Sequence, residues 1–554
     1  MFAQTTAIPD SIFEIKLISL GFDEYPVNGS IPTANIDTIS NLDIKFDTII
    51  DLTGIEDFTD LLYLDCSYNN LTTLNLSQNL SLLELKCSYN FLTTINVTQN
   101  TNLTTFECKN NQIDSLDVSQ NVVLEYLECS ECNLVALDVS QNTSLLQLYC
   151  FNNNLSNLTL NGAISLEIVD CSYSNLTNLD LSQTPALTSL TCSGNDFTTL
   201  DVSQNPLLQT IINYYTQLNS INLNGATALK ELIMEENFVE NLDLTQNPNL
   251  TYLNCRFNSL SSLDLSKNPL LEGIDFSFNN ITSLDLANNI NLKKLNGYEN
   301  QLTSLNISQN PVLTFLSVHN NQLTSLILTG ADSLNYLSFF GNQLTSLDVS
   351  QNLVLKRMYG YRNQLTTLDI SQNPILKSLA ISNNQLTSVD ISHNPLLTML
   401  GCVDNHLMCL NVKNGNNLKL SLSAYNNPDL TCIEVDNVSW SNTNWTPPWE
   451  IDSTANFSSN CFNTCIVSVD EHENNFTNLS FCPNPTTGNV KIYLGEFKTN
   501  IKAIITNSLG QVISTLQFES VDIINLDIDA PKGIYFLQIE TNEGETKTLK
   551  ILKK

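Results

Sequence analysis

The chain has 554 residues, of which 56 are acidic and 23 basic, so its formal net charge at pH 7 is -33. Such a charge repels nucleic acids and anionic membrane surfaces, and it excludes both as electrostatically favoured partners. The excess lies before residue 478: 8 basic and 8 acidic residues follow that point, and 15 basic and 48 acidic residues precede it. No run of 18 apolar residues is present, so the sequence predicts no transmembrane segment.

The chain begins with MFAQTT, in which Phe2-Ala3-Gln4 resembles the end of a bacterial secretory signal peptide. An ordinary intracellular start is the alternative. Residues 10–21, DSIFEIKLISLG, predict a helix that begins with a capping box of Ser11 and Glu14 and ends at Gly21. We interpret residues 1–49 as a signal-peptide remnant followed by a helical cap.

A repeat of 21 residues occupies the middle of the chain. From Cys66 to Cys402 its phase continues for 16 steps without an insertion, which predicts a solenoid of 17 coils, numbered here from Cys66. One column of the repeat is rich in cysteine, at positions 66, 87, 108, 129, 150, 171, 192, 255 and 402. The same column elsewhere holds Met234, Phe276, Val318, Phe339, Ile381, Asn213, Gly297 and Gly360.

Each repeat has two halves. One half reads LxxLxCxxN, as at residues 82–90, and the other reads LxxLDLSQN, as at residues 344–352. The alternating apolar residues predict a short strand with one inward face, and the asparagine that follows predicts a tight turn. We therefore expect two parallel sheets that face each other along the solenoid.

This pattern resembles the bacterial leucine-rich repeats with nested 21-residue units, over roughly residues 50–435. The resemblance implies a mainly β fold, a leucine-rich-repeat solenoid of about 17 coils with a cap at each end. It does not identify a ligand, because this fold is a scaffold for many binding functions.

Three interpretations of the cysteine column are open: an apolar core, a row of disulfides, and a metal site. We favour the core, because Met, Phe, Val and Ile share the column and free cysteine behaves as a small hydrophobe. Sulfurs of in-register neighbours would point the same way, which is a poor geometry for bridging. No histidine is interleaved to complete a zinc site.

The second strand of each coil has an outward column in which Asp is the commonest residue. Like charges at strand spacing repel one another, and calcium would relieve that repulsion by taking several oxygen ligands. We favour a solvated acidic ladder over a calcium site, because no motif supplies a defined cage, and we predict no other cofactor. The aspartates are Asp117, Asp138, Asp180, Asp201, Asp243, Asp264, Asp285, Asp348, Asp369 and Asp390. Seven coils carry Asn75, Asn96, Thr159, Asn222, Asn306, Ile327 or Asn411 instead.

The outward columns of the first strand are irregular, as recognition of a ligand requires. Coils 12–15 place aromatic residues there in succession, with two arginines beside them in an acidic chain. Exposed aromatic residues with arginine are common anchors of protein recognition, and flat aromatic strips also suit sugar rings. An aromatic ladder that only stabilises strand pairing is the alternative. The candidate ligand-binding residues are Tyr298, Phe315, His319, Tyr336, Phe340, Arg357, Tyr359, Tyr361 and Arg362.

A second cap is expected at residues 436–466, after the repeats end. Bacterial repeat proteins of this kind often finish with such a cap, and the resemblance implies a disulfide between Cys432 and Cys461. Cys409 is a rival partner, and the pairing among these residues, Cys465 and Cys482 stays open. Residues 467–478 are polar and predict a linker.

Residues 479–554 predict a small antiparallel β-sandwich from their alternating strands and glycine turns. Its motifs, in order, resemble the type A sorting domain of type IX secretion. That resemblance implies a partnership with the type IX secretion machinery and a final location outside the cell or on its surface. The motif residues are Pro483, Asn484, Pro485, Thr486, Gly488, Gly533, Tyr535, Lys553 and Lys554.

The sequence predicts no enzyme. Its four histidines, residues 319, 393, 406 and 472, do not form a column, and no hydrolase, metalloprotease or nucleotide-binding motif is present. We expect a secreted or cell-surface binding protein, or adhesin, that recognises a protein or glycan. The competing hypothesis is a passive structural or calcium-dependent surface-layer protein without a discrete ligand.

Overall fold

The structure is a computed structural model, and it describes residues 4–446, 448, 450–461, 480–482, 486–507, 511–540 and 546–554. The chain forms two compact units, Met1–Cys465 and Ile466–Lys554. Residues 1–3, which include most of the predicted signal-peptide motif Phe2-Ala3-Gln4, and the predicted linker at residues 467–478 lie outside the described residues.

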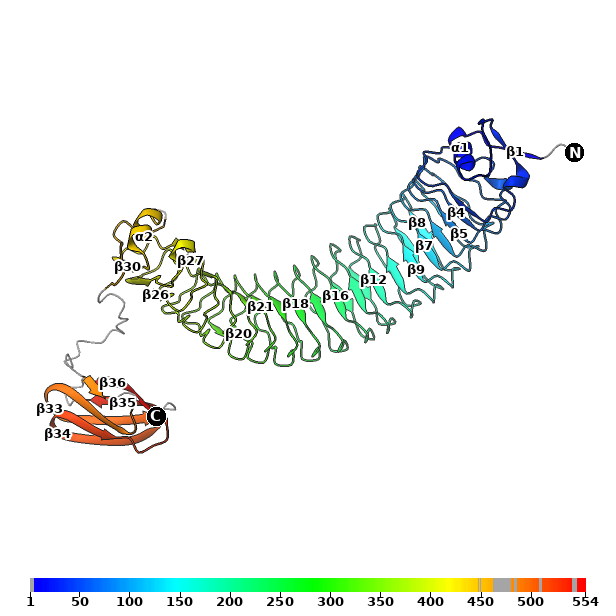
Figure 1. Cartoon of the computed structure of the whole chain (residues 1–554). Helices are drawn as coiled ribbons and strands as arrows, with labels where there is room; N and C mark the ends of the chain where they lie inside the picture. The colour runs from blue at the N-terminus through cyan, green and yellow to red at the C-terminus, as the bar shows by residue number, and fades with distance from the viewer. Residues whose placement is uncertain are drawn as a thin grey trace. The chain divides into compact units, whose positions relative to one another are not determined.

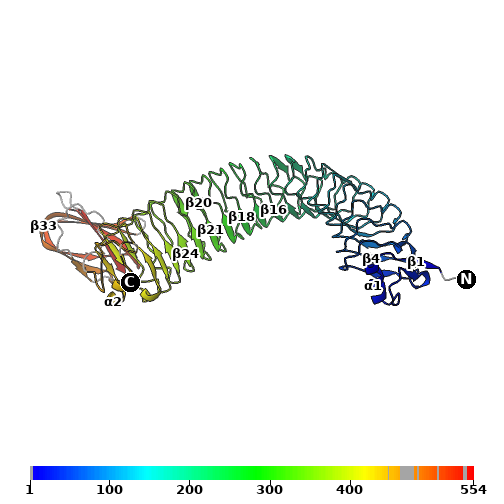
Figure 2. The same ribbon diagram turned by 90° about the horizontal axis from the view of Figure 1, so that it is seen from above.

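One long parallel sheet runs along the first unit (Figures 1 and 2). Its strands have three residues each, and each pairs in register with the strand of the next coil. Within the described residues the sheet has 19 strands. They are β3 (Asn41–Asp43), β4 (Tyr63–Asp65), β5 (Glu84–Lys86), β6 (Thr105–Glu107), β7 (Tyr126–Glu128), β9 (Gln147–Tyr149), β11 (Ile168–Asp170), β12 (Ser189–Thr191), β14 (Thr210–Ile212), β16 (Glu231–Ile233), β17 (Tyr252–Asn254), β18 (Gly273–Asp275), β19 (Lys294–Asn296), β21 (Phe315–Ser317), β23 (Tyr336–Ser338), β24 (Arg357–Tyr359), β25 (Ser378–Ala380), β27 (Met399–Gly401) and β29 (Ser421–Ser423).

The sheet extends by one coil at each end beyond the strict phase of the sequence. Asn41 pairs with Tyr63, and Met399 pairs with Ser421, so both end steps are 22 residues long instead of 21. A single added residue at each end hides these coils from a search for an unbroken period.

The opposite face of the solenoid carries shorter runs of parallel strands. In the described part of the chain, strands pair there in three two-stranded groups and one four-stranded group. The groups are β8 (Ala136–Asp138) with β10 (Asn157–Thr159), β13 (Thr199–Asp201) with β15 (Ser220–Asn222), β20 (Ser304–Asn306) with β22 (Ser325–Ile327), and β26 (Ser388–Asp390) with β28 (Cys409–Asn411), β30 (Cys432–Glu434) and β31 (Asn456–Ser458). We call the face of the long sheet the first face and this one the second face.

The first unit is closed at both ends by short helices (Figure 1). At the N-terminal end, β1 (Thr5–Ala7) and β2 (Ser30–Pro32) pair antiparallel around α1 (Ser11–Ser19), followed by the 3-10 turns η1 (Thr33–Asn35) and η2 (Ile55–Asp57). At the other end, η3 (Asn417–Lys419) and α2 (Val438–Asn444) cover the last coils. Caps are required because an open solenoid end would expose its core.

The predicted helix is present, but its predicted capping box is wrong. Asp10 is the N-cap, and its carboxylate accepts hydrogen bonds from the backbone N–H groups of Ile12 and Phe13. The carboxylate of Glu14 is buried, and it accepts from the backbone N–H groups of Asn28 and Gly29. Asp one position earlier is an equally good cap, and only the fold brings residues 28 and 29 to Glu14.

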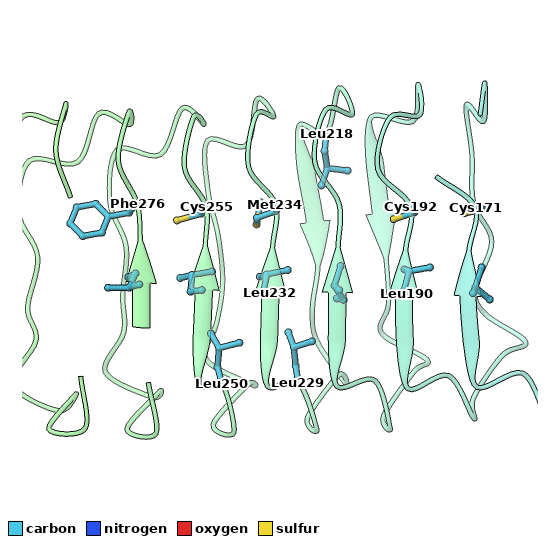
Figure 3. Packing of buried hydrophobic residues seen from close by; sticks show 14 of the residues in the cluster. Cys171, Leu190, Cys192, Leu218, Leu229, Leu232, Met234, Leu250, Cys255 and Phe276 are labelled. Carbon is cyan, nitrogen blue, oxygen red and sulfur yellow. The ribbon is translucent and has the colours of Figure 1, made fainter. Parts of the chain in front are cut away.

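The cysteine column lies inside the first unit, at the end of each strand of the long sheet. Figure 3 shows Cys171, Cys192, Met234, Cys255 and Phe276 in one row. All column cysteines are fully buried and free. Burial raises the pKa of the Cys192 thiol to about 12, so this thiol stays protonated. The column is thus part of the apolar core.

Glycine in the column compensates for phenylalanine in the preceding coil. A Cβ atom on Gly297 would stand 2.2 Å from the ring of Phe276, and one on Gly360 would stand 2.2 Å from the ring of Phe339. Each ring therefore fills the space of two coils, and the missing side chain of the next coil makes room for it.

Asparagines satisfy the backbone where each coil turns. The side-chain amide of Asn90 donates to the carbonyl oxygens of Cys66 (3.0 Å) and Cys87 (3.1 Å), and its Oδ1 accepts from the N–H of Leu71 (3.0 Å). These bonds join one coil to the one before it and pair backbone groups that the turn would otherwise leave buried without a partner.

Coil 8 departs from the repeat in both columns. Asn213 takes the place of cysteine, and Thr216 takes the place of asparagine. The Thr216 hydroxyl lies 2.7 Å from Oδ1 of Asn213, and the Asn213 amide donates to Sγ of Cys192 at 3.2 Å. The buried amide of Asn213 is therefore paired, which explains why a polar residue is tolerated in the core column.

The C-terminal cap contains a disulfide between Cys432 and Cys461, with a Cα–Cα distance of 5.9 Å. This is the pair that the resemblance implied. Cys409 is itself disulfide-bonded and is not the partner of Cys432, so the alternative pairing is wrong.

The second unit is an antiparallel sheet of five strands around a core of its own. Its longest strand, β33, pairs with β32 and β35 and also with β34, while β36 pairs with β35. The strands are β32 (Ser480–Cys482), β33 (Asn489–Asn507), β34 (Val512–Asp527), β35 (Gly533–Glu540) and β36 (Thr546–Lys553).

Separate pieces of the predicted sorting motif meet in this unit. The N–H of Thr486 donates to Leu552 (2.8 Å), and the N–H of Lys554 donates back to Thr486 (2.9 Å). The Thr486 hydroxyl also accepts from the N–H of Gly488 at 3.0 Å. Gly533 begins β35, and the Tyr535 hydroxyl donates to Pro531. The motif residues Pro483, Asn484 and Pro485 lie outside the described residues.

Candidate ligand-binding surface

The parallel register of the long sheet sets the positions of the outward side chains. Since each strand pairs with residues 21 positions away, a column of the sequence becomes a row of side chains along the first face. Two rows matter most: the residue directly after the cysteine column, and the residue that begins each strand.

The first of these rows contains a continuous stack of rings in coils 12–15. Ring centroids lie 4.4 Å apart from Tyr298 to His319, 4.2 Å from His319 to Phe340, and 4.2 Å from Phe340 to Tyr361. The planes of successive rings differ by 9°, 17° and 9°. All four side chains are partly exposed. The structure therefore brings these four sequence-predicted residues together as one stack.

A second, shorter stack lies beside it at the start of the strands. Phe315 and Tyr336 stack with centroids 4.4 Å apart, and the ring of Tyr359 lies 5.7 Å from Tyr336 at a tilted angle. Arg357 follows Tyr336 in the same row and is exposed. Arg362 stands one residue after Tyr361, with a positive φ of 54°, and is also exposed.

The aromatic surface extends further toward the N-terminus than the sequence predicted. Phe257 and Phe278 stack at 4.0 Å, and Phe278 meets the edge of Tyr298 at 5.3 Å. The guanidinium of Arg256 lies 4.6 Å from the centre of Phe257, a cation–π contact. The two phenylalanines belong to a column in which most residues have positive φ, including Tyr215. The sequence contains this column, but it gives no sign that the aromatic residues in it lie beside the stack. That position is visible only in the fold.

A depression lies at that end of the aromatic surface. Its volume is about 710 Å³, and it is lined by Tyr215, Thr216, Gln217, Glu236, Asn237, Phe238, Phe257, Asn258, Ser259 and Phe278. Tyr215 and Phe238 are 56% and 58% exposed, so their rings are open to a ligand.

Three titratable side chains of the stacks, His319, Tyr336 and Tyr361, are uncharged near pH 7. Burial lowers the pKa of His319, so its imidazole is uncharged there. Burial also raises the pKa of Tyr336 and of Tyr361, which keeps both phenols protonated. Charge beside the stacks comes from Glu299, which acts on His319, and from Arg357 and Arg362, which act on Tyr336 and Tyr361.

Stacking decides which part of each ring a ligand can touch. Rings stacked at about 4.2 Å cover one another's faces, so the interior members present their edges to solvent. A ring edge carries the positive part of the aromatic quadrupole, whereas a sugar ring stacks on a face. A free face is available only where a stack ends.

On the second face, the aspartate column is used by the turns. Ser119 N–H donates to Asp117, Ser182 N–H donates to Asp180, and so on through all ten aspartates. Hydrogen bonds from residue 119 lower the pKa of Asp117, and those from residue 182 lower the pKa of Asp180. A carboxylate that accepts from the N–H two residues ahead forms an Asx turn. In the described residues no group of three or more His, Cys, Asp or Glu is placed to hold a metal ion.

Comparison with known proteins begins at the C-terminus, where residues 480–554 match the family described as the secretion system C-terminal sorting domain. Such a domain indicates export through the type IX secretion system, to the cell surface or the medium. No helix in the described part of the chain is long and apolar enough to cross a membrane.

The first unit is a leucine-rich-repeat solenoid. A leucine-rich-repeat protein of Leptospira interrogans has the same fold, with 24% identity, a TM-score of 0.52, and coverage of 64% of this chain and 92% of its own. YopM of Yersinia enterocolitica is similar at 22% identity and a TM-score of 0.50, with coverage of 72% and 92%. Both likenesses concern the fold alone.

Two further matches involve Listeria monocytogenes. Internalin J is 45% identical over 56 residues, a stretch that spans 10% of this chain and 6% of that protein. The functional domain of InlJ, described as including a cysteine ladder, matches with 26% identity, a TM-score of 0.46, and coverage of 100% of this chain and 99% of that chain.

Proposed function

We propose that this protein is an exported recognition protein, or adhesin, that binds a protein or glycan ligand on the first face of its solenoid. The ligand-contacting residues in this proposal are Tyr298, Phe315, His319, Tyr336, Phe340, Arg357, Tyr359, Tyr361 and Arg362. A sorting domain at the C-terminus supports export, and a leucine-rich-repeat scaffold supports binding rather than catalysis.

The observation that carries the proposal is the pair of ring stacks on the first face. They place at least seven partly exposed rings in adjacent rows over four coils. Aromatic residues with arginine dominate the energetics of protein recognition surfaces. A shorter stack of Phe46, Tyr68 and Tyr89 occurs near the N-terminal end of the solenoid, and the four-ring stack of coils 12–15 is longer.

The competing function is a structural surface-layer element, in which calcium joins the aspartates of the second face. The turn hydrogen bonds weigh against this alternative, because each aspartate already has a structural partner in its own coil. Exposed acidic turns also keep a long solenoid soluble without any ligand.

The test uses arrays of purified glycans and purified extracellular proteins, probed with the full chain in the presence and absence of calcium. A double variant, Y336A/Y361A, removes one ring from each stack. If the rings are anchors, it should weaken binding to the positive spots by about 2–4 kcal/mol while the melting temperature barely changes.

The matched control is Y126A/Y149A. These tyrosines also belong to the first face, in coils 4 and 5, and their rings lie 5.7 Å apart. Tyr126 occupies the same row as Tyr336. The control should bind as the wild type does. Unchanged affinity of Y336A/Y361A together with a sharp fall in its melting temperature would mean that the rings are scaffold and that the ligand binds elsewhere.

A further inference from the structure

Charge is distributed unusually around coils 13–16. Residues 300–403 contain four basic residues, Lys356, Arg357, Arg362 and Lys377, and four acidic ones, Asp332, Asp348, Asp369 and Asp390. Three of these acids belong to the turns of the second face. All four basic residues lie in or next to β24 and β25 of the first face. Three of the four acidic residues therefore lie on the second face, whereas the basic residues lie on the first.

The outward positions of the first face carry no acidic residue across these coils. The sixteen positions hold Phe315, Ser317, His319, Asn320, Tyr336, Ser338, Phe340, Gly341, Arg357, Tyr359, Tyr361, Arg362, Ser378, Ala380, Ser382 and Asn383. The bordering acids are Glu299 and Asp404, and both are engaged by amides: Asn320 donates to Glu299 at 2.6 Å, and Asn383 donates to Asp404 at 2.9 Å.

The basic residues of this patch are not neutralised by partners. Elsewhere on the first face, Lys45, Lys86 and Lys109 each form an ion pair with a carboxylate. Among the described residues, neither Arg357 nor Arg362 forms one, and both are exposed. A guanidinium has a planar fork of donors that fits a carboxylate or sulfate in two-point contact. The patch is thus suited to an anion.

Both ring stacks end at coil 15, beside this pair of arginines. The next coil has only small side chains in the corresponding positions: Ala380 follows Tyr359, and Ser382 follows Tyr361. Tyr361 stacks on Phe340 on one side only, and Tyr359 contacts Tyr336 on one side only. Among the described residues no further ring contacts either tyrosine, so the face of Tyr361 away from Phe340 and the ring of Tyr359, which is tilted by 58° against Tyr336, are not covered by another ring.

We propose that this end of the stacks binds an anionic saccharide, with a sugar ring against the open faces of Tyr359 and Tyr361 and its carboxylate or sulfate held by Arg357 and Arg362. The inference rests on the proposed function and specifies its ligand. A pyranose ring has a flat C–H face that matches an open aromatic face. An acidic peptide supplies the charge but not that flat face, and a neutral sugar supplies the face but not the charge.

The test measures binding of the full chain to four immobilised polymers: polygalacturonate, dextran sulfate, neutral dextran and poly-L-glutamate. The first two separate carboxylate from sulfate recognition. We expect binding to one or both of them, little to dextran or poly-L-glutamate, and weaker binding as salt rises, since charge interactions are screened over about 10 Å at 0.1 M salt.

The variant R357Q/R362Q keeps the rings and removes the two charges. It should bind the anionic polysaccharide at least ~10-fold more weakly, as expected for loss of two charge-assisted hydrogen-bonding groups. The control K230Q/K267Q removes two positive charges elsewhere: Lys230 lies in coil 9, and Lys267 lies on the second face. Its affinity for the polysaccharide should stay within about twofold of the wild-type value. Circular dichroism and melting curves verify that all variants are folded.

Several results would overturn the inference. These are equal binding to dextran, equal and arginine-dependent binding to poly-L-glutamate, or wild-type binding by R357Q/R362Q. If no anionic polysaccharide binds but Y336A/Y361A still loses its array ligand, the recognition surface stands and only this ligand class is wrong. If Y336A/Y361A retains every interaction, the proposed function itself fails.

Discussion

Single residues of the core column show how a strict repeat accommodates side chains of different size. Cysteine fills most positions, and phenylalanine enters where the following coil carries glycine. The ring of Phe276 occupies the space that a side chain on Gly297 would need. Neighbouring coils are therefore coupled through volume, although the column looks like a list of independent choices in the sequence.

This coupling predicts a size-dependent rescue. G297A should destabilise the solenoid by about 1–3 kcal/mol, because the new Cβ would stand 2.2 Å from the Phe276 ring. Adding F276L should recover part of that loss by freeing the space. Urea unfolding of the two variants and of F276L alone measures the coupling. Simple additivity of the two single effects would show that the residues are independent.

At the scale of elements, the turns of the second face explain the aspartate column. Each aspartate accepts a hydrogen bond from the backbone N–H two residues ahead, and asparagine does the same in coils that lack it, as Asn96 does with Thr98. Asp and Asn share this geometry, whereas Ala cannot make the bond. The column builds the turn wherever Asp or Asn is present, and Thr159 and Ile327 are the two members that lack such a side chain.

Replacing Asp117, Asp180 and Asp348 tests this role. The triple change to Ala should cost about 0.5 kcal/mol per turn, at the low end for a hydrogen bond because the groups are exposed. The triple change to Asn should be nearly neutral at pH 7. Thermal melting of both variants at pH 7 gives the comparison, and equal losses for Ala and Asn would contradict the turn role.

The pH dependence of the same variants has a definite sign. Hydrogen bonds lower the pKa of these aspartates in the folded state. The stability that the ionised aspartates contribute to folding is therefore present above their unfolded pKa, and it is lost as pH falls through their folded pKa. The wild type should therefore lose more stability than the Asn variant between about pH 5 and pH 3.

At the scale of the whole molecule, the chain divides its tasks between two units with separate cores. The charge follows that division, since the entire net charge of -33 belongs to the part before residue 478. Within the sorting unit, the backbone of Thr486 hydrogen-bonds with Leu552 and Lys554. Its buried side chains form a core separate from that of the solenoid.

Removal of residues 479–554 should leave the solenoid folded and stop its export. We expect the truncated protein to remain in the periplasm, to resist protease as the full chain does, and to be absent from the medium and the cell surface. Fractionation with a periplasmic marker protein and with the full chain as control provides the measurement. Normal appearance of the truncated protein outside the cell would show that the unit is not needed for sorting.

The sequence by itself determined the fold class, the phase of the coils and the rows that face outward. It could do so because parallel in-register pairing turns a period of 21 residues directly into spatial neighbours, as Phe315 and Tyr336 demonstrate. The same rule predicted the row of Tyr298, His319, Phe340 and Tyr361. The disulfide of the C-terminal cap was implied by resemblance to other repeat proteins, since its cysteines lie outside the phase.

Only the tertiary structure decided what these side chains do in their rows. Whether rings stack, and so hide their faces, depends on side-chain rotamers and on the left-handed turn that brings Phe257 and Phe278 alongside. The partners of Asp10 and Glu14 depend on a loop that folds back from residues 28 and 29. A periodic sequence specifies which residues are neighbours along the stack, but hydrogen bonds and ring contacts depend on angles and distances that a period does not contain.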